Sequence, residues 1–263
     1  MIMAKHILSF LILVIISITE ANGQEKCATV FNPDNLSKKQ LEKLELFNDR
    51  VQTIHQNRIN RTKNAPQKSE LLLDQDDIIL IPVVVHILWN NAAENLSQTQ
   101  IHSQIDILNE DFRRMNSDAT NTPVLFQDVA ADAQIQFYLA CEDPNGSPTS
   151  GITRTQTNKT SFSIVTNPNG SVDEQATGIK FNNTGGKTAW NTNKYLNVWV
   201  CDIGGGTLGY AQFPEEYVSK PNTDGVVIDY EAFGENSQLP GYDLGRIATH
   251  EIGHWAGLYH IWG

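Results

Sequence analysis

Residues 250–260 read His-Glu-Ile-Gly-His-Trp-Ala-Gly-Leu-Tyr-His. His250 and His254 are four residues apart, so on a helix their imidazoles lie on the same face and can bind one metal ion. The residues spaced to form the opposite face are apolar: Leu244, Ala248, Ile252 and Trp255. This pattern predicts an amphipathic helix near the end of the sequence, with Asp243 as its N-terminal cap.

The third histidine of this stretch requires a break in the helix. His260 follows His254 by six residues, which on a continuous helix would place it roughly 240° round the axis. The helix must therefore end and the chain must turn back. Gly257 stands where the break is needed, and glycine enters a left-handed conformation at low cost. We expect a tight turn at Gly257 to bring His260 to the same ion.

The side chains at residues 250–260 are typical of a catalytic zinc site. Three histidines leave the fourth position of a tetrahedral zinc ion to water, whereas structural sites have four protein ligands. Glu251 directly follows the first ligand, so it can reach that water as a general base without binding the metal. The alternative is that these histidines are ordinary helix residues, but few unrelated chains would match all the specified positions by chance.

The rest of the pattern predicts an α+β fold, with helices packed against a mixed sheet. Residues 81–89 form a nearly continuous apolar run that predicts a buried strand, and His86 within it is interpreted as a core histidine. A helix follows, in which Ser97 and Gln100 have the spacing of a capping box. Its apolar stripe is Ile101, Ile105, Leu108, Phe112 and Met115. Further strands are predicted at residues 134–140, 195–201 and 226–230, with a short one near Ile152.

The N-terminus has the features of a secretory signal peptide at residues 1–23. Lys5 precedes an apolar run at residues 7–18, and the small residues Ala21 and Gly23 suit a cut before residue 24. A membrane anchor is the alternative, but the run is too short to span about 30 Å of hydrocarbon. We therefore expect a secreted, extracellular protein with no stable membrane insertion.

Charge divides the remainder near residue 80. Residues 24–80 carry nine acidic and nine basic side chains, whereas residues 81–263 carry twenty acidic and nine basic ones. The first part is expected to be a propeptide with a helix at 36–55 and an exposed activation linker at 57–69, although a plain interdomain linker has the same composition. Residues 81–263 are expected to be the catalytic domain. The formal net charge of -11 argues against nucleic acid as a partner.

The zinc motif resembles the extended signature of the metzincin metallopeptidases. Trp255 and the Gly-Leu-Tyr-His ending are similar to the pappalysin family in particular. The resemblance runs through most of residues 81–263, and the segments that carry it are 83–86, 108–112, 143–146, 196–200 and 204–214. By this resemblance, His250, His254 and His260 are zinc ligands and Glu251 is the general base.

The resemblance also implies a fold and a substrate site. Residues 81–263 would be the N-terminal subdomain of a metzincin, a twisted mixed β-sheet with a backing helix and an active-site helix. An edge strand would line the cleft and bind an extended peptide by strand addition. This strand would contain Leu208, Gly209, Tyr210, Ala211 and Gln212. An edge strand that is merely protected by loops is the alternative.

One departure from the family pattern concerns the C-terminal side. The sequence stops three residues after His260 and lacks the methionine turn of the metzincin C-terminal subdomain. The resemblance therefore implies that this subdomain is missing and that calcium, which family sites bind partly through it, belongs only to the full-length parent. An inactive truncated fragment is an alternative to an active enzyme.

The three cysteines receive two different interpretations. Cys141 and Cys201 each end a predicted strand and are expected to form a disulfide in an oxidising compartment, although one or both could be buried thiols, or Cys201 could pair with a cysteine in the missing region. Cys27 is the odd cysteine and is predicted to be a latency switch, since a thiolate would take the zinc position that the catalytic water needs. A free or intermolecularly paired Cys27 is the alternative. Activation would follow a cut after Arg58, Arg61, Lys63 or Lys68.

The expected function is that of a secreted zinc-dependent endopeptidase made as a zymogen. Its partners would be protein or peptide substrates and its own propeptide. A non-catalytic binding or adhesion module on a metzincin shell is the main alternative, and the intact Glu251 argues against it. A zinc hydrolase with a non-peptide substrate is a further alternative, and the edge strand argues against that.

Overall fold

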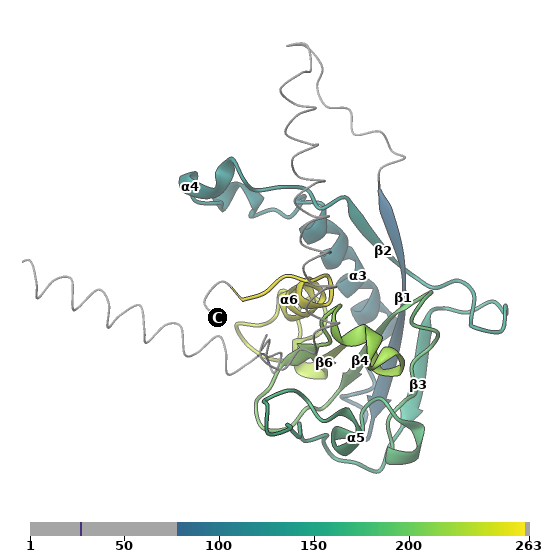
Figure 1. Cartoon of the computed structure of the whole chain (residues 1–263). Coiled ribbons are helices and arrows are strands. Elements are labelled where there is room, and N and C mark those ends of the chain that lie inside the picture. Colours follow the sequence, from purple (N-terminus) through teal and green to yellow (C-terminus); the bar gives the residue numbers. More distant parts are fainter. Residues whose placement is uncertain (1–26, 28–77, 261–263) are drawn as a thin grey trace, which may run out of the picture.

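The computed structural model describes Cys27 and residues 78–260, which include a β-sheet with its two long helices, α3 (Gln98–Phe112) and α6 (Arg246–Trp255), on one face (Figure 1). The strands are β1 (Ile79–Trp89), β2 (Ile135–Leu139), β3 (Ile152–Gln156), β4 (Leu196–Cys201), β5 (Gly209–Ala211) and β6 (Val226–Asp229). The shorter helices are α4 (Val124–Gln127) and α5 (Glu174–Thr177). Short 3-10 turns lie at Ala119–Asn121, Asn182–Thr184, Glu216–Val218, Pro221–Thr223 and Tyr230–Ala232.

The sheet is mixed, as the sequence predicts. Its strand order is β2-β1-β4-β6-β5, and β3 pairs with β1 off this path. The long strand β1 pairs with β2 along residues 79–83 and with β3 along residues 85–89, while β4 pairs along its other side. All these pairs are parallel, whereas β5 is antiparallel to β6. The three-residue strand β5 therefore forms one edge of the sheet.

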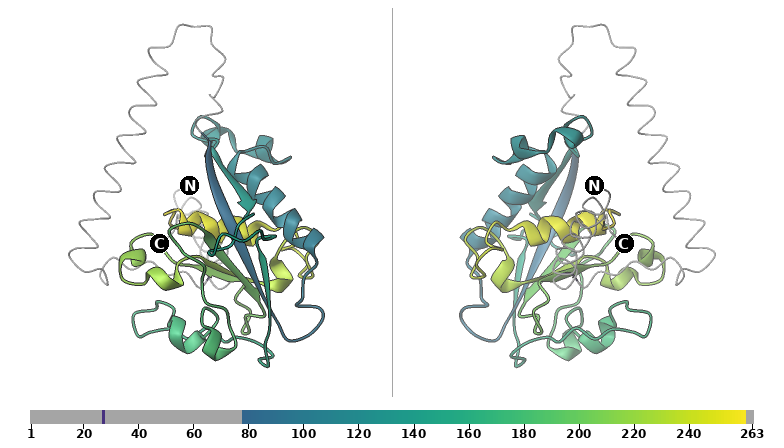
Figure 2. Two further views of the ribbon diagram at one scale, coloured as in Figure 1. Left: turned by 90° about the vertical axis from the view of Figure 1, so that its right-hand side faces the viewer. Right: turned by 90° about the vertical axis from the view of Figure 1, so that its left-hand side faces the viewer.

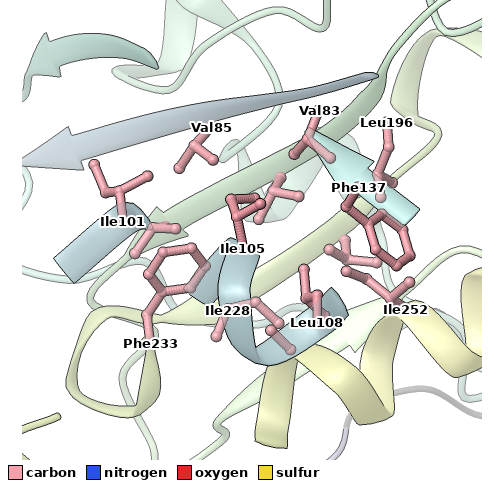
Figure 3. Packing of buried hydrophobic residues seen from close by; sticks show 14 of the residues in the cluster. Val83, Val85, Ile101, Ile105, Leu108, Phe137, Leu196, Ile228, Phe233 and Ile252 are labelled. Atoms are coloured by element: carbon pink, nitrogen blue, oxygen red, sulfur yellow. The ribbon is translucent and has the colours of Figure 1, made fainter. Parts of the chain in front are cut away.

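Alternate side chains of the central strands fill two separate hydrophobic clusters. On one face, Val83, Val85 and Ile87 pack with the apolar side of α3 and α6 (Figure 3). On the other face, Leu88 and Trp199 pack under the long segment between β3 and β4. Figure 2 shows α3 and α6 together against the sheet, with the α5 region at the opposite end. Burial on both faces explains why β1 reads as a continuous apolar run.

Helix α3 confirms part of its predicted pattern. Ser97 caps it, since its hydroxyl accepts a hydrogen bond of 3.1 Å from the backbone N–H of Gln100. The reciprocal half of the capping box is wrong: the Gln100 side chain donates instead to the carbonyls of Phe233 and Glu235. Met115 is also misplaced in the predicted stripe, because the helix ends at residue 112 and Met115 is 60% exposed.

Helix α6 begins later than the sequence suggested. Its N-terminal cap is Gly245, in a left-handed conformation at φ 65°, so Asp243 is not the cap. Leu244 precedes the helix and is 61% exposed, so it is not part of the apolar face. The helix is instead tied to α3 through Asp111, which accepts a hydrogen bond of 2.8 Å from Thr249 and pairs with Arg246 at 3.2 Å.

The predicted disulfide between Cys141 and Cys201 is wrong. Both residues are free thiols, and Cys141 is exposed while Cys201 is buried. Cys141 lies just after β2 and Cys201 is the last residue of β4, and these two strands lie on opposite sides of β1. Two strands separated by a third are about 10 Å apart, whereas the Cα atoms of a disulfide are usually within about 7 Å.

Several expectations lie outside the described residues. These are the signal peptide at 1–23, the helix at 36–55, the linker at 57–69 and, apart from Cys27, the propeptide as a whole. In the part of the chain that the structure does describe, none of the helices combines the length and apolar character needed to cross a bilayer.

Candidate metal centre and active site

The end of α6 forms a turn that is stabilised by two backbone hydrogen bonds. Gly257 has φ 93°, as expected from its place between the second and third histidines. Its N–H donates to the carbonyl of His254 at 2.8 Å, and the N–H of Leu258 donates to the carbonyl of Gly253 at 2.9 Å. This pair of bonds is a Schellman motif. It ends the helix and turns the chain back toward the helix face that carries His254.

The turn brings three imidazoles to one point. The Nε2 atoms of His250, His254 and His260 lie 3.0–3.1 Å from one another. Tetrahedral zinc with Zn–N bonds of about 2.0–2.1 Å requires ligand nitrogens about 3.3 Å apart. These donors therefore fit a zinc ion with shifts of a few tenths of an ångström.

Hydrogen bonding orients His254 for metal binding. Its Nδ1 atom lies 2.6 Å from the carbonyl oxygen of Leu258, which can only accept, so Nδ1 donates the proton. In the neutral ring this leaves a lone pair on Nε2, directed at the other two histidines. Burial lowers the pKa of His254 to about 4 and also lowers the pKa values of His250 and His260. The three rings are thus neutral at pH 7, as metal ligands must be.

Cys27 reaches the same centre from the N-terminal part of the chain. Its sulfur and the ligand nitrogens of the three histidines all lie within 4.8 Å of one another. The thiol also donates a hydrogen bond of 3.5 Å to Oε2 of Glu251. Cys27 is buried, and its backbone forms a parallel bridge with Gly209 of the edge strand β5.

Glu251 lies on α6 against the edge strand and is only 1% exposed. A β-carbon at Gly209 would be 2.8 Å from Cγ of Glu251 and 3.0 Å from the carbonyl oxygen of Val227. Only glycine therefore lets β5 approach Glu251 this closely. The carboxylate consequently lies between the histidine cluster and the backbone of the sheet edge.

The predicted edge strand at residues 208–212 has its central residues in β5. Leu208, Tyr210 and Gln212 are buried with Gly209 and Ala211, and the strand is antiparallel to β6. Antiparallel pairing with β6 uses one side of the β5 backbone. The other side is where Cys27 forms its bridge.

Sequence reasoning missed residues that support the turn after α6. The Tyr259 hydroxyl donates a hydrogen bond of 2.5 Å to Glu215, and the Phe213 ring contacts the rings of Tyr259 and His254. On the helix, the Trp255 indole N–H donates to Asp224 at 3.1 Å. These contacts join residues 31 to 46 positions apart, and no local spacing predicts them.

The amino-acid sequence is similar to those of known metalloproteases. A peptidase M43 family model, described as Pregnancy-associated plasma protein-A, matches residues 180–263. An extracellular metalloprotease of Neurospora crassa is 46% identical over 72 residues, which are 26% of this chain and 25% of that protein. Another from Colletotrichum graminicola is 30% identical over 192 residues, 69% of this chain and 52% of that protein. The matches thus span a quarter to about half of these relatives' lengths.

Solved structures extend the likeness to the whole fold. A promirolysin mutant of Tannerella forsythia has 46% sequence identity and a TM-score of 0.68, and the match covers 90% of this chain and 70% of that one. Mature mirolysin of Tannerella forsythia in complex with a cleaved peptide has 55% identity and a TM-score of 0.65, over 71% and 66% of the two chains. With its three converging histidines and mixed sheet, the chain belongs to the pappalysin family of metzincin metallopeptidases.

Proposed function

We propose that this protein is a secreted zinc endopeptidase that is made as a latent zymogen. The observation that carries the proposal is the convergence of three imidazole nitrogens beside the buried carboxylate of Glu251. His250, His254 and His260 would hold the metal. A zinc ion there would supply a Lewis acid that lowers the pKa of water and polarises the scissile carbonyl.

Glu251 would act as the general base and then as the general acid. Its place next to His250 on α6, and its packing against Gly209, keep the carboxylate beside the histidine cluster. It would accept a proton from the attacking water as the C–O bond forms. It would then deliver that proton to the amine nitrogen as the C–N bond breaks, which balances the hydrolysis.

The substrate would be an extended peptide bound along β5. An edge strand offers backbone N–H and C=O groups that a peptide can pair with, and side-chain pockets then add specificity. Gly209 and Ala211 present little side-chain bulk toward α6, so a peptide could lie close to Glu251 and the histidines. The peptide-bound structure of mature mirolysin supports this substrate class.

Latency would come from Cys27, which would occupy the position of the substrate beside β5, Glu251 and the three histidines. Its sulfur lies with the histidine nitrogens, its thiol contacts Glu251 and its backbone bridges Gly209. One segment would thus block metal, base and substrate edge together. We also propose a signal peptide at 1–23, a propeptide at 24–80 that is cut within 57–69, and a catalytic domain that begins at residue 81. The likeness to promirolysin supports the presence of a propeptide, and the extracellular relatives support export.

The test is the conservative substitution Glu251→Gln, which removes the basic carboxylate and keeps its size. We expect this variant of the full-length activated protein to keep its metal and its fold and to lose casein cleavage by at least about a hundredfold. Glu110→Gln, on the outer part of α3, is the matched control and should cleave normally. Cleavage by Glu251→Gln at the rate of the control would disprove the assignment.

A non-catalytic binding module is the competing function. Such a module requires neither a carboxylate beside the metal nor a thiol that contacts both the metal ligands and that carboxylate. The contact between Cys27 and Glu251 therefore favours the latent enzyme.

A further inference from the structure

A fully buried lysine lies beneath the edge strand on the face away from α6. The side chain of Lys180 is 0% exposed. Its Nζ atom donates to Oε1 of Glu174 at 2.5 Å and to the carbonyl oxygen of Thr223 at 2.7 Å. The same nitrogen lies 5.1 Å and 4.9 Å from the ring centres of Trp199 and Tyr210. A buried ammonium is costly unless it is paired in this way.

Glu174 passes the interaction on to the edge strand. Its second oxygen, Oε2, accepts a hydrogen bond of 2.8 Å from the hydroxyl of Tyr210, the central residue of β5. Both carboxylate oxygens therefore have a donor, one from Lys180 and one from Tyr210. Burial and the nearby Glu174 raise the pKa of Tyr210, which keeps its hydroxyl protonated as a donor.

A second connection runs from Lys180 through Thr223 to Gln212, the residue that directly follows β5. The Thr223 hydroxyl donates to Oε1 of Gln212 at 2.9 Å, and Nε2 of Gln212 donates to the carbonyl of Lys220 at 3.0 Å. Tyr210 and Gln212 are two positions apart, so both side chains point to the face opposite α6. Lys180 thus anchors the chain at Tyr210 within β5 and at Gln212 just after it.

The opposite face of β5 is where the proposed chemistry takes place. Gly209 packs against Glu251 there, and Ala211 belongs to the cluster that includes α6. The strand has three residues; among the described residues its one ladder partner is β6, and an isolated bridge joins Gly209 to Cys27. A strand this short gains little rigidity from backbone pairing alone, so side-chain anchors on one face determine where its backbone lies on the other.

We propose that Lys180, Glu174 and Tyr210 are positioning residues that set the height of the edge strand over Glu251 and thereby govern the binding of extended peptides. This inference rests on the proposed endopeptidase function. It assigns to a buried ion pair, on the far side of the sheet from the histidines, the alignment of a substrate that pairs with β5. A short substrate that does not pair with β5 is independent of this anchor.

The test compares two substrates and two pairs of matched variants. Tyr210→Phe removes only the hydroxyl that reaches Glu174, and Tyr195→Phe removes a hydroxyl that bonds to the Glu142 carbonyl away from β5. Lys180→Met removes the ammonium, and Lys159→Met removes another ammonium that lies over a ring, that of Phe162. Each full-length variant is activated, and its zinc content is measured alongside cleavage of a long peptide and a dipeptide-sized substrate.

We expect Tyr210→Phe to raise KM for the long peptide about tenfold, with kcat, zinc content and the short substrate within about twofold of wild type. Lys180→Met should raise KM for the long peptide by more than Tyr210→Phe does. The controls Tyr195→Phe and Lys159→Met should leave KM unchanged. An equal loss on both substrates, or no loss for Tyr210→Phe, would overturn the inference.

Hydrogen exchange keeps the inference testable without activity. If the wild-type protein cleaves no peptide, the proposed function fails, but the anchor still predicts faster amide exchange at residues 208–212 in Tyr210→Phe than in Tyr195→Phe. Exchange rates that match between these two variants would contradict the anchor. If Lys180→Met does not fold, Tyr210→Phe decides the question alone.

Discussion

The backbone of Gly209 packs directly against the side chain of Glu251, leaving 2.8 Å between Cγ of the glutamate and the place of a β-carbon on the glycine. Real Cβ atoms essentially never come that close, so the contact requires glycine. It joins the sheet edge to the carboxylate that lies beside the histidine cluster. Cys27 forms its backbone bridge to the same glycine. The proposed general base, the proposed substrate-binding strand and the proposed latency switch therefore meet at Gly209.

Gly209→Ala should therefore displace Glu251. The added methyl group meets Glu251 on one side and the rigid carbonyl of Val227 on the other, so the flexible glutamate must move. We expect kcat to fall at least about tenfold with zinc content unchanged, since misplacement of a general base removes much of its effect. Gly204→Ala is the control, because its methyl group would meet only the Ser161 side chain. Wild-type kcat in Gly209→Ala would show that Glu251 need not lie here.

Gly257→Ala should weaken metal binding. A residue with a side chain at φ 93° is strained by about 1–2 kcal/mol, and relief of that strain would move His260 away from the other two ligands. We expect about a tenfold loss of zinc affinity in a competition titration with a chelator. Gly253→Ala, within α6, adds a methyl group in ordinary contact with Leu258 and should bind zinc normally. Equal affinities in the two variants would count against the turn as the device that presents His260.

The buried His86 should make the folded protein less stable in acid. It is fully buried between Thr153 and Asn197, and burial lowers its pKa from 6.5 to about 4. His86 therefore binds a proton more readily in the unfolded chain than in the folded one. The free energy of unfolding has its full value above pH 6.5 and falls by about 3 kcal/mol as the pH is lowered toward 4. Urea unfolding of wild type and His86→Gln across this range measures it. The variant should show a shallower dependence on pH, and parallel curves would contradict the assignment.

Cys27→Ala should release latency. Loss of the sulfur removes its contacts with the histidine nitrogens and with Glu251. We expect the uncut full-length variant to cleave peptides, or to process itself, before any activating protease is added. Cys141→Ala is the matched control, because Cys141 is an exposed free thiol far from the histidines in sequence. A Cys27→Ala zymogen as latent as this control would mean that steric cover by the propeptide alone maintains latency.

Local patterns predicted much of the fold. The alternating apolar residues of β2 and β4 and the four-three spacing of α3 follow from packing against the core, so periodicity shows them directly. The ends of helices and strands were harder to predict from the sequence. Arg114 takes φ 51°, which turns the chain after α3 and leaves Met115 in solvent although its spacing continues the stripe.

Long-range arrangement is where sequence reasoning failed. Alternation shows that β2 and β4 are strands but not that β1 separates them, and the disulfide prediction depended on that order. The histidine motif could be predicted because all its members lie within 11 residues of one another. The anchor formed by Lys180, Glu174 and Tyr210 could not, since a lysine in a polar loop segment gives no sign that it is buried.

The metal centre itself can be measured by zinc absorption spectroscopy on the latent and the activated full-length protein. We predict one zinc per molecule, with three imidazole nitrogens and one sulfur at about 2.3 Å in the latent form. In the activated form an oxygen should replace the sulfur while the three imidazoles remain. Substoichiometric zinc, or a latent form with no sulfur or fewer than three imidazoles, would contradict the proposal that His250, His254, His260 and Cys27 form a latent catalytic zinc site.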